Sequence, residues 1–324
     1  MGGHSLAGGA LRFREVEVLC RNRPAEVVPF DAVAALWPEA QPALERIACP
    51  RADLTGIKLS TPRVMGVVNV TPDSFSDGGQ LAGPEAAIAH AMTMVADGAD
   101  ILDIGGESTR PGATPVGEDE ETERVIPVIE GLISRGCAVP ISIDTRNAAV
   151  AKAAIDAGAR IINDVSALTH DPDSLNSALA ADGVCLMHAL GDPRTMQNNP
   201  TYENVLLDIY DYLADRLAAA TTHGIDPAEV LVDPGIGFGK TIAHNLDLVR
   251  NLSLFHGLGC GMLLGVSRKG FIGKLGVEPQ ADLRLGGSLA VGLAGLDQGA
   301  QILRVHDVKQ TAQAVRLWRA LNRG

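Results

Sequence analysis

From residue 64 to the end of the chain, short apolar runs alternate with longer segments whose apolar residues recur every three or four positions. Apolar runs of about four to eight residues bounded by Gly or Pro are typical of buried strands, and the longer spacing is typical of helices. The pattern predicts eight strands, at 64–69, 99–106, 139–144, 159–164, 183–188, 230–233, 261–267 and 300–305. Between them it predicts helices, among them 84–98, 147–158, 203–224 and 282–299, several closed by the glycine expected past a helix C-terminus.

Eight strand–helix units in about 260 residues match the size of a (β/α)₈ TIM barrel. An open, doubly wound sheet is the alternative α/β fold, but it rarely needs eight such even units. We therefore predict a TIM barrel that forms a catalytic domain over residues 63–324.

Residues 1–62 do not follow this alternation. The segment 13–20 alternates like an exposed strand, and 29–48 resembles a short helix interrupted by proline. The segment 54–64 could form a hairpin that closes the bottom of the barrel. We predict a small N-terminal extension that packs on the barrel, and not a second catalytic domain.

Composition limits the partners and the compartment. The formal charge of −12 argues against a nucleic-acid or membrane-surface partner, which leaves small molecules. Five cysteines without a CxxC pair suggest neither a disulfide framework nor a zinc site, which fits a reducing compartment. The first ten residues lack the pattern of a signal peptide, and the longest apolar stretch, 286–296, is too short to span a bilayer. We expect a cytoplasmic protein.

Polar residues end all eight predicted strands, and the active sites of TIM barrels lie at that end. They are Asn69, Glu107 to Arg110, Asp144, Asn163 with Asp164, His188, Asp233, Ser267 to Lys269, and Arg304 with His306. One such residue would be explained as well by a helix cap or a turn. Eight that converge at one mouth predict a binding site.

Two kinds of chemistry follow from these residue types. Cationic side chains after the last two strands stand where barrels commonly bind phosphate, so we expect an anionic group there. The carboxylates and the amide at Asp144, Asn163 and Asp233 suit a flat heterocycle that carries amino and lactam groups. The loops 70–83 and 106–117 are rich in Gly, Pro, Ser and Thr and have the composition of mobile lids.

Eight motifs carry a resemblance to one enzyme family. MGVVNVTPDSFSDGG, DIGGESTRPGA, ISIDT, INDVSA, LMH followed by PRTMQ, DPGIGFGKT, GVSRKGFIG and RVHDV resemble, in this order and spacing, the dihydropteroate synthases of folate biosynthesis, from about residue 64 to 308. That family joins 6-hydroxymethyl-7,8-dihydropterin diphosphate to p-aminobenzoate and releases diphosphate. The resemblance also implies inhibition by sulfonamides.

The resemblance implies a role for each matching position. The pterin would be bound by Asp144, Asn163, Met187, Asp233, Phe238, Lys269 and the flat face of Arg304. The diphosphate would be bound by Asn69, Arg304 and His306, with Mg²⁺ recruited at Asn69. The p-aminobenzoate pocket would be completed by Phe75, Thr109, Arg110, Pro111, Ser267 and Arg268, with Asp77 on the first loop. The residues expected to take part in catalysis are Asn69, Asp77, Arg304 and His306.

Such a reaction needs no nucleophilic side chain. If the C–O bond to diphosphate breaks first, the methylene cation delocalises into the dihydropterin ring, and the enzyme has to stabilise separated charges. Asp77 could then lie near the cation, and the cationic residues with Mg²⁺ would neutralise the leaving group. The neutral arylamine is already nucleophilic, so positioning matters more than deprotonation.

Several alternatives stay open. DPGIGFGKT lacks the first glycine of a P-loop, so Lys240 is expected to cap or pack, and His188 either lines the site or is structural. A pterin-binding relative of corrinoid methyltransferases would not need the STRP loop or the RVH anion site, and a non-catalytic pterin-binding paralogue is a third possibility. The uncharged stretch 286–296 is either core or the contact face of a homodimer; we expect a homodimer.

Overall fold

The computed structural model describes residues 3–70, 83–107, 116–191 and 195–322. Within them, eight parallel strands close into a barrel in which each strand pairs with the next along the chain and the last with the first. These strands are β5 (Arg63–Asn69), β6 (Ile101–Gly105), β7 (Ile141–Asp144), β8 (Ile161–Asp164), β9 (Gly183–Met187), β10 (Val230–Asp233), β11 (Gly261–Leu264) and β12 (Ile302–Val305). The predicted TIM barrel is confirmed, and each strand lies within a predicted run or one residue outside it.

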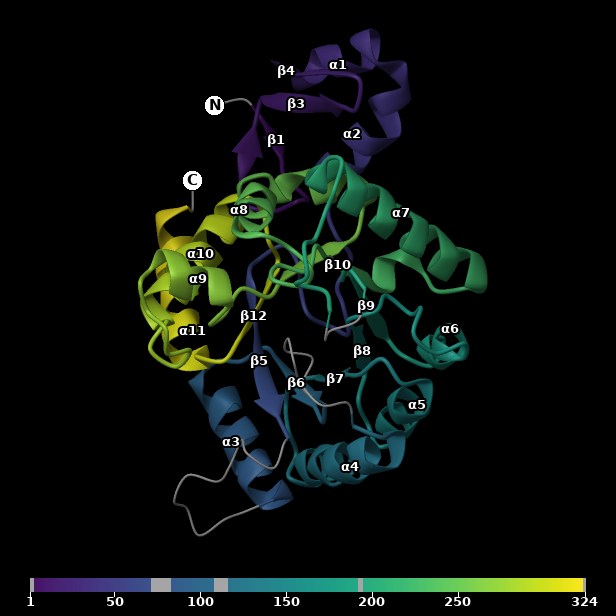
Figure 1. Ribbon diagram of the computed structural model, residues 1–324, viewed down its shortest axis with the longest axis vertical. Coiled ribbons are helices and arrows are strands. Elements are labelled where there is room, and N and C mark those ends of the chain that lie inside the picture. Colours follow the sequence, from purple (N-terminus) through teal and green to yellow (C-terminus); the bar gives the residue numbers. More distant parts are fainter. Residues whose placement is uncertain (1–2, 71–82, 108–115, 192–194, 323–324) are drawn as a thin grey trace.

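Helices surround the strands (Figure 1). They are α3 (Pro84–Asp97), α4 (Glu118–Ser134), α5 (Ala148–Asp156), α6 (Ser174–Ala178), α7 (Val205–His223), α8 (Ile242–Arg250), α9 (Gly270–Leu275), α10 (Leu285–Asp297) and α11 (Val308–Leu321), with the 3₁₀ segments η2 (Pro227–Glu229) and η3 (Leu252–Leu258). The predicted glycine ends are confirmed at Gly98 and Gly224, whose φ values of 110° and 113° favour glycine. No helix among the described residues has the length and apolar character needed to cross a membrane.

The N-terminal extension forms a small sheet-and-helix unit beside the barrel (Figure 1). Strand β1 (His4–Ser5) pairs with β2 (Arg12–Phe13), and β3 (Glu15–Cys20) pairs with β4 (Arg23–Pro29), both antiparallel. Helix α1 (Phe30–Leu36), η1 (Pro38–Ala40) and α2 (Gln41–Ala48) follow, so the segment 29–48 is helical and interrupted at proline, as expected. Val28, Val33, Trp37 and Leu44 form a separate apolar cluster in this unit.

Two arginines fasten the extension to the N-terminal end of the barrel. Arg46 Nε donates to the carbonyl of Gly257 at 2.6 Å, and Arg51 Nε donates to the carbonyl of Cys260 at 2.8 Å. Desolvation lowers the pKa of Arg51, yet its donors are used by backbone carbonyls, including that of His256 at 3.0 Å. The division at residue 62 stays a prediction.

The segment that leads into β5 fills the bottom of the barrel. Leu54 and Leu59 are buried among inward-facing side chains of seven barrel strands: Met65, Ile101, Ile161, Cys185, Leu231, Leu263 and Ile302. The expected hairpin is shorter than predicted, because it consists of a single bridge between Leu54 and Ile57. Residues before the first barrel strand therefore complete the barrel core.

Truncating Leu54 tests this contribution to the core. Leu54→Ala should lower the free energy of unfolding by about 2–5 kcal/mol, because it removes buried methyl groups and leaves a cavity. Urea unfolding measures the loss. The exposed Leu36 of α1 provides the control, since Leu36→Ala should change the unfolding free energy by less than about 0.5 kcal/mol. Equal effects of the two substitutions would contradict the packing argument.

Candidate active site

A cavity of about 700 Å³ opens at the C-terminal ends of the barrel strands. Of the residues that the family resemblance assigns to catalysis or binding, those that line it are Asn69, Asp144, Phe238, Ser267, Arg268, Lys269, Arg304 and His306. Asn163, Met187 and Asp233 are buried at the ends of β8, β9 and β10. The structure therefore brings together residues that are more than two hundred positions apart. Phe75, Asp77, Thr109, Arg110 and Pro111 lie outside the described residues.

Arg304 joins two carboxylates across the barrel mouth. Its Nε donates to Asp103 Oδ2 and its Nη2 to Asp144 Oδ2, each at 2.5 Å. Asn163 Nδ2 donates to the same Asp103 oxygen at 3.0 Å. Strands β6, β7, β8 and β12 are thereby connected by one polar network at the floor of the cavity.

Sequence reasoning missed Asp103. This side chain is fully buried, and its Oδ1 has no hydrogen-bond partner among the described residues. The available signal was an aspartate between Leu102 and Ile104, inside the predicted strand 99–106, because a strand interior accepts a charge only when the charge is compensated. Its compensating partner, Arg304, is 201 positions away.

The floor of the cavity contains acids whose protonation is shifted. Desolvation raises the pKa of Asp144 to about 7, which Arg304 opposes and Asp103 reinforces. Desolvation also raises the pKa of Asp233, although the N–H of Gly235 donates to Asp233 Oδ1 at 2.7 Å and opposes the shift. For Arg304, desolvation alone would lower the pKa, but Asp103 and Asp144 raise it, so the guanidinium stays charged. The floor can therefore accept hydrogen bonds from an N–H-rich ligand.

The loop after β10 supplies a flat aromatic surface. Lys269 Nζ lies 3.9 Å from the centroid of the Phe238 ring, a cation–π distance. The loop needs glycine: at Gly235, with φ 68°, a Cβ would lie 1.9 Å from the carbonyl oxygen of His188. Phe238 is thus presented to the cavity by a loop that has no room for side chains on its inner side.

Hydrogen bonds of buried Lys240 connect this loop to His188. Buried Lys240 Nζ donates to the carbonyls of Phe238 at 2.9 Å and His188 at 3.3 Å, and lies 2.9 Å from His188 Nδ1. Desolvation lowers the pKa of Lys240 to about 7 and that of His188 to about 3, the latter with a contribution from Lys240. Lys240 packs and caps carbonyls, as predicted, and His188 is a structural histidine.

The predicted p-aminobenzoate and diphosphate residues adjoin each other. Ser267 Oγ accepts from the backbone N–H of His306 at 3.2 Å and lies 3.0 Å from its Nδ1. Arg268 donates to both carboxylate oxygens of Asp307, from Nε at 3.0 Å and from Nη2 at 2.6 Å. The two predicted subsites therefore lie side by side at the ends of β11 and β12.

Comparison with known proteins identifies the family. The pterin binding enzyme family matches residues 65–306. The dihydropteroate synthase of Neisseria meningitidis serogroup B is 48% identical over 271 residues, which cover 82% of this chain and 94% of that protein. The chain belongs to the dihydropteroate synthase family. It is accordingly a transferase of folate biosynthesis, as the sequence motifs predicted.

Solved structures of dihydropteroate synthases share the fold. The Xanthomonas albilineans enzyme with 4-aminobenzoic acid has a TM-score of 0.78 and 46% identity, covering 84% of this chain and 98% of that one. The Yersinia pestis enzyme in a sulfonamide drug complex has a TM-score of 0.79 and 42% identity, covering 85% of this chain and 100% of that one. Small molecules are therefore the partners of this family.

The protonation of Asp144 gives a direct test of the cavity floor. In the ligand-free protein Asp144 should titrate at about pH 7, being protonated below and ionised above. Arg304→Gln removes the cation that favours the ionised form, so it should raise the pKa of Asp144 further. Carboxyl ¹³C shifts in Asp-labelled protein, assigned with Asp144→Asn, measure both values. An Asp144 pKa near 4 in both proteins would contradict this electrostatic description.

Proposed function

We propose that this cavity performs the dihydropteroate synthase reaction with the pterin on the acidic floor and the diphosphate at the basic edge. The observation that supports this division is the placement of Arg304, which contacts Asp103 and Asp144 and lines the same cavity as Lys269 and His306. A guanidinium at that point borders both an acceptor-rich floor and the cationic side of the mouth. It can therefore contact a ring and a leaving group at once.

The pterin ring would be recognised by hydrogen bonds at its edge and by stacking on its two faces. Asp144, Asn163 and Asp233 offer acceptors and donors that suit the amino and lactam edge of the ring. Phe238 and the guanidinium plane of Arg304 offer faces on which a flat heterocycle can stack, with Met187 as an apolar contact. Asp103 orients Asn163 and Arg304 and so takes part indirectly.

The donor set fits a Mg²⁺ ion held mainly by diphosphate. Among the described residues, no group of three or more His, Cys, Asp or Glu side chains could hold a metal by itself. Mg²⁺ commonly keeps several waters and uses one or two protein ligands beside substrate phosphates, and Asn69 lines the same cavity as Arg304 and His306. We infer that Asn69 would hold Mg²⁺, whose charge would help neutralise the leaving group.

Bond breaking would precede bond making. The C–O bond of the substrate breaks and its electron pair leaves on diphosphate, whose charge Arg304 and His306 stabilise. The amino nitrogen of p-aminobenzoate then attacks the methylene carbon and afterwards loses a proton. Ser267 and Arg268, together with the predicted loop residues Phe75, Asp77, Thr109, Arg110 and Pro111, would position the arylamine, so no strong general base is needed.

Removal of Arg304 tests the assignment. Arg304→Ala should reduce diphosphate release by purified protein with both substrates about 10²–10³-fold, because the developing leaving-group charge loses its main fixed cation. Arg304→Lys keeps the positive charge but loses the bidentate hydrogen bonding of the guanidinium, so it should retain part of the activity. This variant also serves as the control for folding. The matched control is Arg250→Ala on α8, an exposed arginine paired only with Asp247 in the described part of the chain, which should turn over normally. Near-normal turnover by Arg304→Ala would refute the proposal.

We also propose a homodimer that forms through α9, α10 and α11, which lie together on one side of the barrel (Figure 1). Of the large apolar side chains that are exposed in the described residues, a majority belongs to this region: Leu275, Val277, Leu283, Leu317 and Leu321. Ala290 and Ala294 add an exposed small-residue side of α10, while Leu296 faces the core. The stretch 286–296 thus combines core packing with an accessible face.

Sedimentation tests the homodimer. Leu317→Glu should shift the protein from dimer toward monomer, because it places a charge in the proposed apolar contact. Leu36→Glu, at an exposed leucine of α1, is the control and should leave the dimer intact. A wild-type protein that is monomeric at micromolar concentration would refute the homodimer.

A further inference from the structure

The N-terminal extension lies outside the region that identifies the family. The family match begins at residue 65, and the Yersinia pestis structure is covered completely while 15% of this chain stays unmatched. Contacts between the extension and the cavity-forming loops therefore belong to a part of the protein that the family assignment does not explain. One such contact is made by Arg21.

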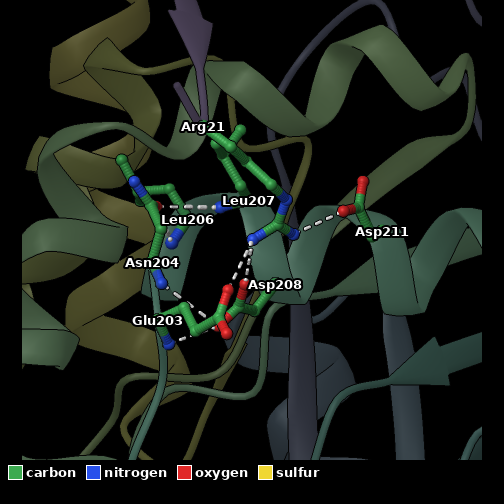
Figure 2. Close-up of polar contacts among 7 residues, drawn as sticks. All are labelled: Arg21, Glu203, Asn204, Leu206, Leu207, Asp208 and Asp211. Atoms are coloured by element: carbon green, nitrogen blue, oxygen red, sulfur yellow. Dashed lines mark hydrogen bonds and ion pairs between the residues drawn. The ribbon is translucent and has the colours of Figure 1, made fainter. Parts of the chain in front are cut away.

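Arg21 extends from the turn between β3 and β4 to the first turns of α7 (Figure 2). Its Nη1 donates to Asp208 Oδ1 at 2.7 Å and its Nη2 to Asp211 Oδ2 at 2.5 Å. A third acidic group, Glu203 Oε2, lies 4.0 Å from Nη1. One guanidinium thus connects the extension to three acidic residues at the beginning of α7 and just before it.

Asp208 also accepts hydrogen bonds from the loop before α7. While one of its oxygens accepts from Arg21, the other accepts the backbone N–H groups of Glu203 at 2.9 Å and Asn204 at 3.2 Å (Figure 2). Burial alone would raise the pKa of Asp208, but the hydrogen bonds from Arg21 and from these two N–H groups lower it. The ionised carboxylate therefore links the extension to the backbone at residues 203–204.

The same loop is bonded to the segment that carries Phe238. Tyr202 Oη donates to the carbonyl of Gly239 at 2.7 Å, and Gln197 Nε2 donates to the carbonyl of Gly237 at 2.5 Å. These glycines flank Phe238, and both Gln197 and Pro200 line the cavity. Hydrogen bonds at its two ends, joined by the backbone of the loop 195–204, therefore connect Arg21 and Asp208 to the segment that carries Phe238.

We propose that Arg21 is a positioning residue, through which the N-terminal extension holds the loop 195–204, and with it Phe238, in the orientation that binds the pterin substrate. The proposal rests on the proposed function, because it requires the pterin to use Phe238. Exposed ion pairs contribute little to stability by themselves, so a purely structural ion pair would leave the kinetic constants unchanged. The kinetic constants therefore distinguish the two roles.

Steady-state kinetics of the full-length protein with both substrates provide the test. Arg21→Ala should raise KM for dihydropterin diphosphate about two- to five-fold, with kcat and KM for p-aminobenzoate changed less than two-fold. Asp211→Asn removes the charge that pairs with Arg21 Nη2 but leaves the bond to Asp208, so it should raise KM for dihydropterin diphosphate less than Arg21→Ala does. Arg21→Lys keeps the charge and should recover part of the wild-type KM.

Arg135 provides a matched control. It pairs with Glu85 at 2.5 Å, and its side chain is 42% exposed against 39% for Arg21, but its pair joins α4 to α3. Arg135→Ala should leave both KM values unchanged. An unchanged KM for the pterin substrate in folded, active Arg21→Ala would overturn the inference, and so would an equal change in Arg135→Ala. Failure of the proposed function is a separate outcome, since it would appear as near-normal turnover by Arg304→Ala, whatever the KM of Arg21→Ala.

Discussion

The site depends on one guanidinium that connects the two sides of the barrel mouth. Arg304 on β12 pairs with Asp103 on β6 and Asp144 on β7, and its side chain is 22% exposed while that of Asp103 is fully buried. Charges in such positions are tolerated only when they are paired and hydrogen-bonded, and removal of one partner leaves the other uncompensated. The position of Arg304 is therefore determined by the floor beneath it before any substrate binds.

This arrangement leaves the floor rich in acceptors. Asp103 keeps one oxygen without a partner among the described residues, and burial raises the pKa values of Asp144 and Asp233 by desolvating their carboxylates. A ring edge that carries N–H groups supplies the missing donors, because a carboxylate can accept two parallel N–H bonds. In the proposed function, this charge distribution would favour the N–H edge of a pterin over an anionic or purely apolar ligand.

The sequence predicted those features that local pattern controls. Strand runs, glycine helix ends and the polar strand ends all follow from spacing along the chain, and so the barrel and the gathering of Asp144, Lys269 and Arg304 were foreseen. Asp103 was not, because its role depends on an arginine 201 positions away. The pairing of Arg268 with Asp307 was not predicted either, since it depends on side-chain directions at loop ends. For Lys240 the sequence predicted capping or packing, but not which carbonyls accept its hydrogen bonds.

The glycine loop after β10 shows why a distant segment can influence this site. Gly235 packs directly against the His188 carbonyl and Gly239 against Leu190. The carbonyls of Gly237 and Gly239 accept hydrogen bonds from Gln197 and Tyr202. The orientation of Phe238 is then controlled by whatever fixes the loop 195–204. In this chain the extension supplies that restraint through Arg21, which does not line the cavity, so the residue that positions the site is separate from the residues that would carry out the reaction.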